Sequence, residues 1–151
     1  MTYNLYIIKD LLANYLHHTL AISHLTSDRL SCPIKNVLIS HNGYLSMPAD
    51  WLRIISAQDW KEQRISKEHF YLIWDWDSEC KKRTDCEYLG FQHLVSANAL
   101  LFAVQKLFEE LQQWELALYD IAAQNGTLEE MGKISLKFID NPVCLYTASL
   151  Q

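Results

Sequence analysis

The sequence predicts an α/β fold: a small mixed or parallel sheet with flanking helices, followed by a long helix and a short C-terminal helix. Short apolar runs alternate with polar or helix-forming segments in the first two thirds of the chain, as strands do in an α/β sheet. After Ala97 the apolar residues recur at steps of three and four, which is the period of a helix. The 151 residues suffice for one domain, or for one domain and part of another.

The N-terminal half predicts two helices and two strands. Residues 5–16 carry an apolar stripe at helical spacing, so we expect a helix there. The run at 37–39 is a short apolar strand closed by the turn signal Asn-Gly, and a second strand follows at 51–55. Ser56 is a suitable N-cap for the short helix that "SAQDWKEQ" predicts.

Two further strands are expected before the long helix. Residues 69–76, "HFYLIWDW", are rich in aromatic side chains and form the clearest strand pattern of the chain. The polar segment 77–85, "DSECKKRTD", is expected to be exposed and mobile. The run "FQHLVS" at 91–96 predicts the last strand.

The long helix is predicted from Ala97 to the sequence "QNGT", with Gly126 as the C′ residue in its terminating turn. Thr127 caps a second helix, which ends before Pro142. An uninterrupted heptad stripe runs along the long helix. Its members are Ala97, Leu100, Val104, Leu107, Leu111, Trp114, Leu118 and Ile121.

This stripe has two interpretations. It can pack on the sheet of its own domain, or it can form the seam of a homodimer, with the bulky Trp114 favouring irregular packing across a two-fold axis. The second interpretation predicts that Leu111→Glu abolishes dimerisation and leaves the α/β unit folded. The dimer interface would comprise Leu100, Val104, Leu107, Leu111, Trp114, Leu118 and Ile121.

These elements predict three parts: a small α/β unit at 1–98, a helical segment at 99–140, and the opening of a new element at 141–151. The last part begins with a turn at Asn141-Pro142, and the apolar run behind it resembles the first half of a strand. A lone strand leaves backbone groups unpaired, so we expect its partners to lie beyond this chain.

Charge and composition exclude several classes of function. The net charge of −5 does not suit a nucleic-acid-binding surface, which needs basic side chains against phosphates. No run of about 18 apolar residues could span a membrane, and the N-terminus lacks the basic region of a signal peptide. The four cysteines are scattered without a C-x-x-C pair and are expected to be reduced thiols, which favours a cytoplasmic location.

Candidate ligand-binding residues follow from the fold class. Ligands of open α/β sheets bind beyond the carboxyl ends of the strands, and that region is predicted to hold His41, Asn42, Asp75, Trp76 and Asn98. An alternative places Asp75 and Asp77 on one side of a strand as an acid/base pair of a small enzyme. No glycine-rich phosphate loop is present, and the histidines lack metal-ligand spacing, so no cofactor and no metal are expected.

The order of these elements resembles the N-terminal region of bacterial transcriptional regulators of the PucR/CdaR-like type. The resemblance is carried by Leu107, Phe108, Trp114 and Leu118, and then by Leu128 through Asn141-Pro142-Val143. It implies a small α/β sensory or regulatory domain at 1–98, a helical dimerisation or linker segment at 99–140, and the start of a following PAS/GAF-like domain at 141–151. It also implies a helix-turn-helix at the far C-terminus of the full regulator, which this chain does not contain.

The sequence therefore predicts a non-enzymatic regulatory domain of a bacterial transcriptional regulator, which senses a small-molecule effector, forms a homodimer, or does both. Direct contact with nucleic acid is not expected from this chain. Two alternatives remain open. One is the small enzyme using Asp75 and Asp77, and the other is an adaptor domain whose helical face docks a different protein.

Overall fold

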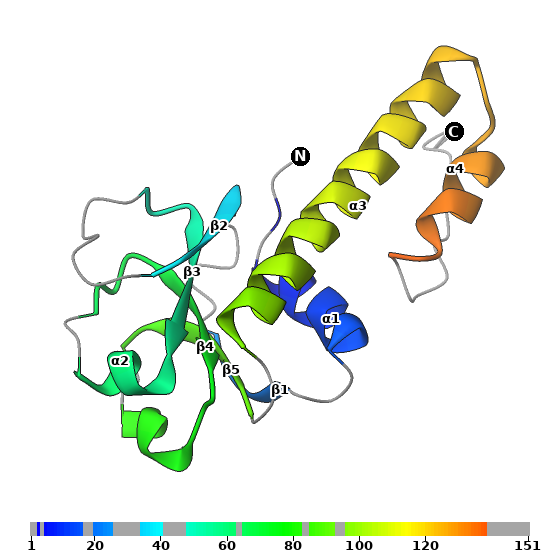
Figure 1. Ribbon diagram of the computed structural model, residues 1–151. Helices are drawn as coiled ribbons and strands as arrows, with labels where there is room; N and C mark the ends of the chain where they lie inside the picture. Colours follow the sequence, from blue (N-terminus) through cyan, green and yellow to red (C-terminus); the bar gives the residue numbers. More distant parts are fainter. Residues whose placement is uncertain are drawn as a thin grey trace, which may run out of the picture. The chain divides into compact units, whose positions relative to one another are not determined.

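The computed structural model describes residues 3, 5–16, 20–25, 34–40, 48–62, 65–82, 85–92 and 96–138 (Figure 1). The chain divides into two compact units, Thr2–Leu107 and Phe108–Gln151. The division between these units lies inside helix α3 (Ala97–Ala123), so this one helix contributes residues to both units.

The first unit is built on a five-stranded mixed sheet in the order β1-β5-β4-β3-β2. Four neighbouring strands are parallel, and β1 pairs antiparallel with β5 at one edge. The predicted fold class is thereby confirmed. The strands are β1 (Leu20–His24), β2 (Asn36–Ile39), β3 (Trp51–Ser56), β4 (Phe70–Trp74) and β5 (Glu87–Phe91).

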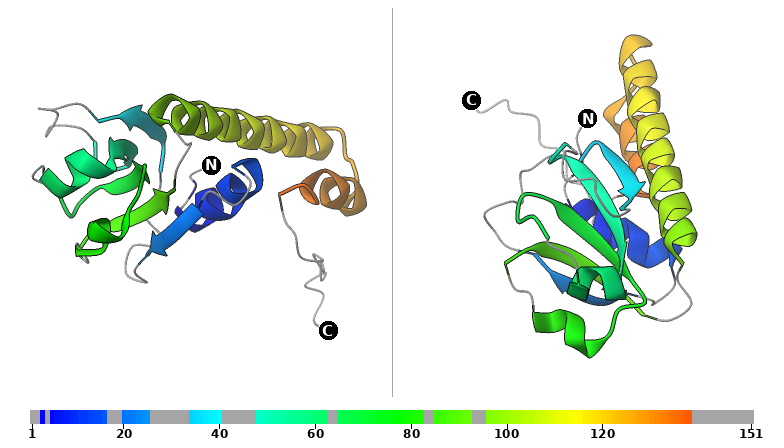
Figure 2. Two further views of the ribbon diagram at one scale, coloured as in Figure 1. Left: turned by 60° about the horizontal axis from the view of Figure 1, so that its bottom comes forward. Right: turned by 60° about the vertical axis from the view of Figure 1, so that its left-hand side comes forward.

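Helices cover both faces of this sheet (Figures 1 and 2). Helix α1 (Leu5–Tyr15) and the first turns of α3 lie on one face, and α2 (Ala57–Glu62) with the 3-10 helix η2 (Ser78–Lys82) lies on the other. Burial on both faces explains why most residues of β3, β4 and β5 are apolar, whereas a strand with one exposed face would alternate apolar and polar residues. The face below α1 and α3 has its core in the residues Leu52, Ile54, Phe70, Leu72, Leu89 and Phe91.

The opposite face forms a second core around Trp60, which is fully buried. The Trp60 ring lies 5.2 Å from the Tyr71 ring and 5.1 Å from the Tyr88 ring, measured between centroids. Its Nε1 donates a hydrogen bond of 3.2 Å to the backbone oxygen of Cys80. Trp60 therefore ties the short helix α2 both to the sheet and to η2.

The sheet differs from the prediction at two strands. We did not predict β1, and we placed the last strand at residues 91–96, whereas β5 spans Glu87–Phe91. The pattern misled because β5 contains Glu87, which is buried, and Gly90, which is unfavourable in most strands. Gly90 is needed for packing, since a Cβ there would lie 2.4 Å from Cδ1 of Trp76.

The segment expected to be exposed and mobile forms η2 over Ser78–Lys82 and buries Cys80. Asp77 organises this turn: its Oδ1 accepts a hydrogen bond from the Glu79 backbone N–H at 2.9 Å, and its backbone oxygen accepts from the N–H of Cys80. Ser78, Glu79, Lys81 and Asp85 are exposed as predicted. The helical turn was not predicted, because polar composition does not reveal a turn that is capped by its own aspartate.

The end of α3 confirms the predicted stop but changes its key residue. Asn125 takes the left-handed conformation, with φ of 54°, and occupies the C′ position that we had assigned to Gly126. The N–H of Gly126 bonds to the oxygen of Ile121, and the N–H of Asn125 bonds to that of Ala122. This is a Schellman motif, and asparagine is the residue besides glycine that commonly accepts this position.

The second unit contains the rest of α3 and the antiparallel helix α4 (Leu128–Ser135). Trp114 Nε1 donates a 3.0 Å hydrogen bond to Ser135 Oγ, and the Trp114 ring lies 5.1 Å from that of Phe138. Lys137 and Glu110 form an ion pair at 3.1 Å. These contacts fix α4 against α3 within the unit. The predicted domain start at 141–151 lies outside the described residues.

A capping box starts α4 as the sequence predicts. Thr127 Oγ1 accepts from the Glu130 backbone N–H at 3.2 Å, and Glu130 Oε2 accepts from the Thr127 N–H at 2.7 Å. We expect Thr127→Ala to destabilise α4 by about 0.5–2 kcal/mol. Hydrogen exchange of the α4 amides measures this loss. Thr127→Ser, which keeps the acceptor oxygen, is the control and should exchange at nearly the wild-type rate.

The predicted dimer seam is largely buried within one chain. Leu100, Val104 and Leu107 have no measurable exposure, and Leu111 is 1% exposed. Trp114, Leu118 and Ile121 are half-buried. The first four side chains are therefore not available to a second copy, because the chain's own fold already covers them. The apolar period reports a buried helix face but does not say which molecule covers it.

Candidate functional site

The candidate site lies where the parallel strands β3 and β4 end. Ser56 pairs with Trp74 in the sheet, so the residues that follow these two strands begin at the same edge. Asp75 directly follows β4, is exposed, and has φ of 57°, which is the left-handed region that aspartate tolerates better than most residues. After the turn at Asp75, the N–H of Trp76 bonds to the oxygen of Phe91, the last residue of β5, at 2.8 Å.

Trp76 is a core residue in the structure. It is 7% exposed and packs with Trp60, Tyr88 and Cys80, and its indole lies against the position of Gly90. Lys81 Nζ lies 5.7 Å from the ring centroid, within the range of a cation–π contact. The indole Nε1 is buried and has no hydrogen-bond partner among the described residues. A ligand could therefore meet Trp76 only at its edge or after a local rearrangement.

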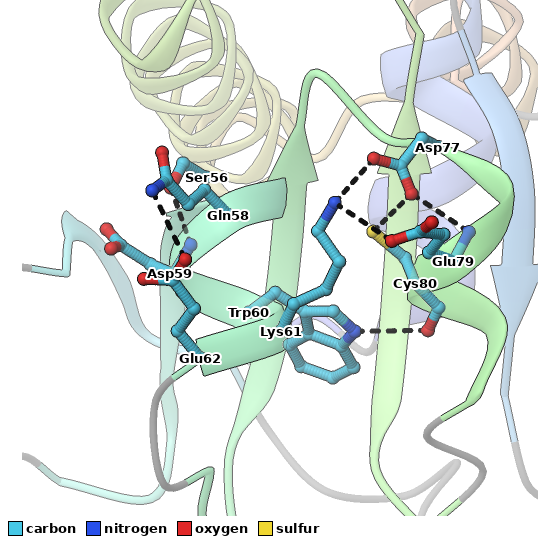
Figure 3. A network of polar contacts seen from close by, with 9 residues as sticks. All are labelled: Ser56, Gln58, Asp59, Trp60, Lys61, Glu62, Asp77, Glu79 and Cys80. Carbon is cyan, nitrogen blue, oxygen red and sulfur yellow. Dashed lines mark hydrogen bonds and ion pairs between the residues drawn. The ribbon is translucent and has the colours of Figure 1, made fainter.

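A polar network connects α2 with the turn after β4 (Figure 3). Lys61 Nζ lies 2.7 Å from Oδ2 of Asp77 and 3.9 Å from Oε2 of Glu79. The second oxygen of Asp77 contacts the Cys80 thiol, with 3.7 Å between Sγ and Oδ1. Lys61 thus neutralises one of the two carboxylates that an acid/base mechanism would need.

The electrostatics of this network oppose proton donation by Asp77. The hydrogen bond from Lys61 holds the pKa of Asp77 below its usual value, and the same bond raises the pKa of Lys61. A general acid at neutral pH needs a raised carboxyl pKa. Burial raises the pKa of the Cys80 thiol, which disfavours the nucleophilic thiolate.

We expect Asp77→Asn to lower the melting temperature at pH 7, because it removes the charge that Lys61 pairs with but keeps an acceptor oxygen. The folded pKa of Asp77 is depressed, so its contribution is present above the unfolded value of about 3.9 and is lost as the pH falls through the folded pKa. The difference between wild type and variant in thermal scans should therefore shrink at strongly acidic pH.

Glu79→Gln is the matched control for Asp77→Asn, because Glu79 is more exposed and 3.9 Å from Lys61. It should change the melting temperature less. An equal effect of both variants, or an Asp77→Asn effect that does not depend on pH, would contradict the assignment of the Lys61–Asp77 pair.

The remaining predicted residues do not join this network as a group. Asn98 is exposed in the first turn of α3. His41 and Asn42, which follow β2, lie outside the described residues. Lys61 was not predicted as a site residue, because in the sequence it is one polar residue of a short predicted helix. Pairing it with Asp77 requires knowledge that α2 and η2 lie on the same face.

A buried polar row on the same face was also missed. Arg53 of β3 aligns with Tyr71 of β4 and Tyr88 of β5, and His24 of β1 stacks on Tyr88 with centroids 5.4 Å apart. Arg53 is 4% exposed. Desolvation lowers its pKa, and the neighbouring Tyr71 opposes this shift. In the sequence, "WLRIIS" reads as an ordinary strand with one exposed arginine.

Among the described residues there is neither a cluster of metal ligands nor a helix that could span a membrane. No three histidine, cysteine, aspartate or glutamate side chains among these residues come together as ligands of one metal ion would. Within the same part of the chain, none of the helices combines the length and the apolar character that crossing a lipid bilayer requires. Cys80 and Cys86 are both buried cysteines that form no disulfide bond.

Comparison with known proteins does not assign this chain to a family. No protein-family model matches it, and neither a curated protein sequence nor a solved structure is significantly similar to it.

Proposed function

We propose that this chain is a non-enzymatic regulatory domain of a bacterial transcriptional regulator, of the PucR/CdaR-like type that its sequence resembles. The sheet unit would receive a signal, and α3 would pass the change to the helical unit and to the parts of the regulator that bind DNA. The acidic net charge of −5 favours a role that does not include direct contact with DNA. The proposed location is the cytoplasm, where the buried thiols stay reduced.

The continuity of α3 carries this proposal. The helix runs for 27 residues without interruption. Its first turns supply Leu100, Val104 and Leu107 to the core of the sheet unit, and its later turns carry Trp114, which binds Ser135 of α4. In the proposed mechanism, a change in how the first turns of α3 pack on the sheet is passed along the same helix to Trp114.

The mechanism would be a shift between conformations. A ligand that binds one packing of α3 on the sheet better than another changes the populations by its difference in affinity. The effector would bind at the strand ends, where exposed Asp75 and the Lys61–Asp77 pair offer charged and hydrogen-bonding groups.

The enzyme alternative is less well supported. It needs a carboxylate with a raised pKa beside Asp75, and the ion pair with Lys61 shifts the pKa of Asp77 in the opposite direction. We therefore retain Asp75 and its neighbours as binding residues and assign no catalytic residue.

Hydrogen exchange tests the coupling through α3. Val104→Ala removes buried methyl groups where α3 packs on the sheet, and Ile73→Val removes a buried methyl from β4, outside α3. The proposal expects faster exchange of amides in residues 108–138 only in Val104→Ala. If both variants leave this region at the wild-type rate, or accelerate it equally, α3 does not couple the units.

The functional class has its own test in the gene. The open reading frame that encodes this chain should also encode a helix-turn-helix segment, and the full-length product should bind DNA through it. A full-length product that lacks any DNA-binding segment would contradict the regulator assignment, whatever the exchange experiment shows.

A further inference from the structure

Helix α3 exposes three large apolar side chains on the face opposite to its buried stripe. Phe102 is 67% exposed, Leu116 is 57% exposed and Tyr119 is 65% exposed. They belong to a second heptad series with steps of three and four, which we call the outer stripe. Its members are Phe102, Gln105, Glu109, Gln112, Leu116, Tyr119 and Ala123, and all seven are exposed.

We propose that the outer stripe pairs with the outer stripe of a second copy of this chain, with the two α3 helices antiparallel across a two-fold axis. This inference rests on the proposed function, for which the sequence predicts a homodimer, and it places the contact away from the predicted seam, whose first four residues are buried. Phe102, Leu116, Tyr119 and Ala123 are the apolar members of the outer stripe, and they occupy positions at which one helix can pack along another.

The antiparallel pair that we propose has a defined register. The register that places Phe102 level with the partner's Tyr119 also places Gln105 level with the partner's Leu116. In the middle of the same register, Glu109 meets the partner's Gln112, whose amide N–H can donate to the carboxylate. Aromatic layers then close both ends of the contact, and a central polar layer fixes the register.

Charge gives an independent argument for this orientation. Lys106 and Asp120 are exposed and lie along the same edge of the outer stripe. Lys106 follows Phe102 by four residues, and Asp120 follows Leu116 by four residues. In the antiparallel register the partner's Asp120 lies along the same edge as Lys106, five positions from level with it, and the symmetry makes the pair twice. A parallel pair in register would instead place Glu109 beside the partner's Glu109, where like charges repel, and would separate Lys106 from Asp120.

Charge reversal with rescue tests this surface. Sedimentation equilibrium of the full chain, over a range of protein concentrations, should show a reversible dimer. Lys106→Glu and Asp120→Lys should each raise the dissociation constant about tenfold, because two exposed ion pairs become repulsive. The double variant should return it to near the wild-type value. Lys133→Glu on α4 has the same charge change outside the outer stripe and should have no effect.

Leu116→Ser tests the apolar part of the same contact and should also weaken the dimer, while circular dichroism confirms that this exposed substitution leaves the fold intact. A dimer that ignores both charge reversals and Leu116→Ser would overturn the outer-stripe assignment while leaving self-association in place. A dimer that the double variant fails to restore would overturn the antiparallel register.

A chain that stays monomeric at every concentration would overturn the inference and would make a different protein the occupant of the outer stripe. That result would leave the coupling through α3 unaffected, since the exchange experiment measures it within one chain. Failure of this inference and failure of the proposed function are therefore distinguishable.

Discussion

Trp60→Ala is expected to lower the free energy of unfolding of the sheet unit by about 3–5 kcal/mol, the range for removing a large buried aromatic side chain. Trp60 has no measurable exposure and packs against the rings of Tyr71 and Tyr88. Its loss also removes the hydrogen bond to the Cys80 oxygen, which leaves a buried acceptor without its donor. Urea unfolding followed by circular dichroism measures the loss.

The control for this variant is Gln58→Ala in the same short helix. Gln58 is exposed, and its side-chain amide donates a hydrogen bond of 3.2 Å to Glu62 of the same helix (Figure 3). Its replacement should change the unfolding free energy by less than about 0.5 kcal/mol. If Trp60→Ala were as mild as Gln58→Ala, the helix α2 would not depend on its tryptophan anchor.

Leu111→Glu is expected to destabilise the chain itself by about 3–5 kcal/mol, since it removes a buried leucine and places a carboxylate in its position. This replaces the sequence-based expectation that the variant would only abolish dimerisation. The leucine is covered within one copy, so any loss of dimer would follow from loss of structure. Urea unfolding at low protein concentration separates the two effects.

The destabilisation by Leu111→Glu should depend on pH in a defined direction. A buried carboxyl without a partner has a folded pKa above its unfolded value of about 4.3, so the folded state binds the proton more tightly. The loss of stability is largest above the folded pKa and decreases as the pH falls below it. Gln113→Glu adds the same group at an exposed position of α3 and should show neither effect.

Local signals predicted the elements whose cause lies within a few residues. Ser56 caps α2 by accepting the N–H of Asp59, and Thr127 forms its box with Glu130. The period after Ala97 predicted α3 because a helix with one buried face repeats its apolar residues along the chain. These signals need no knowledge of the rest of the molecule.

Other features depend on residues that are distant in sequence. Gly90 makes sense in β5 only beside the Trp76 ring, and the polar segment 78–82 folds over Cys80 because Trp60 reaches its oxygen. In the sequence Asp77 resembles half of a carboxylate pair with Asp75. In the structure it forms an ion pair with Lys61, with 2.7 Å between Nζ and Oδ2. No spacing in the sequence announces any of these contacts.

The sequence by itself determined the fold class, the long helix and its stop, and the caps of α2 and α4, because hydrophobic period and capping are properties of neighbouring residues. The tertiary structure alone decided which partner each apolar face has. It buries Leu100, Val104, Leu107 and Leu111 within one chain and leaves Phe102, Leu116 and Tyr119 exposed. Burial depends on what packs opposite a surface, and a linear pattern records only that the surface is apolar.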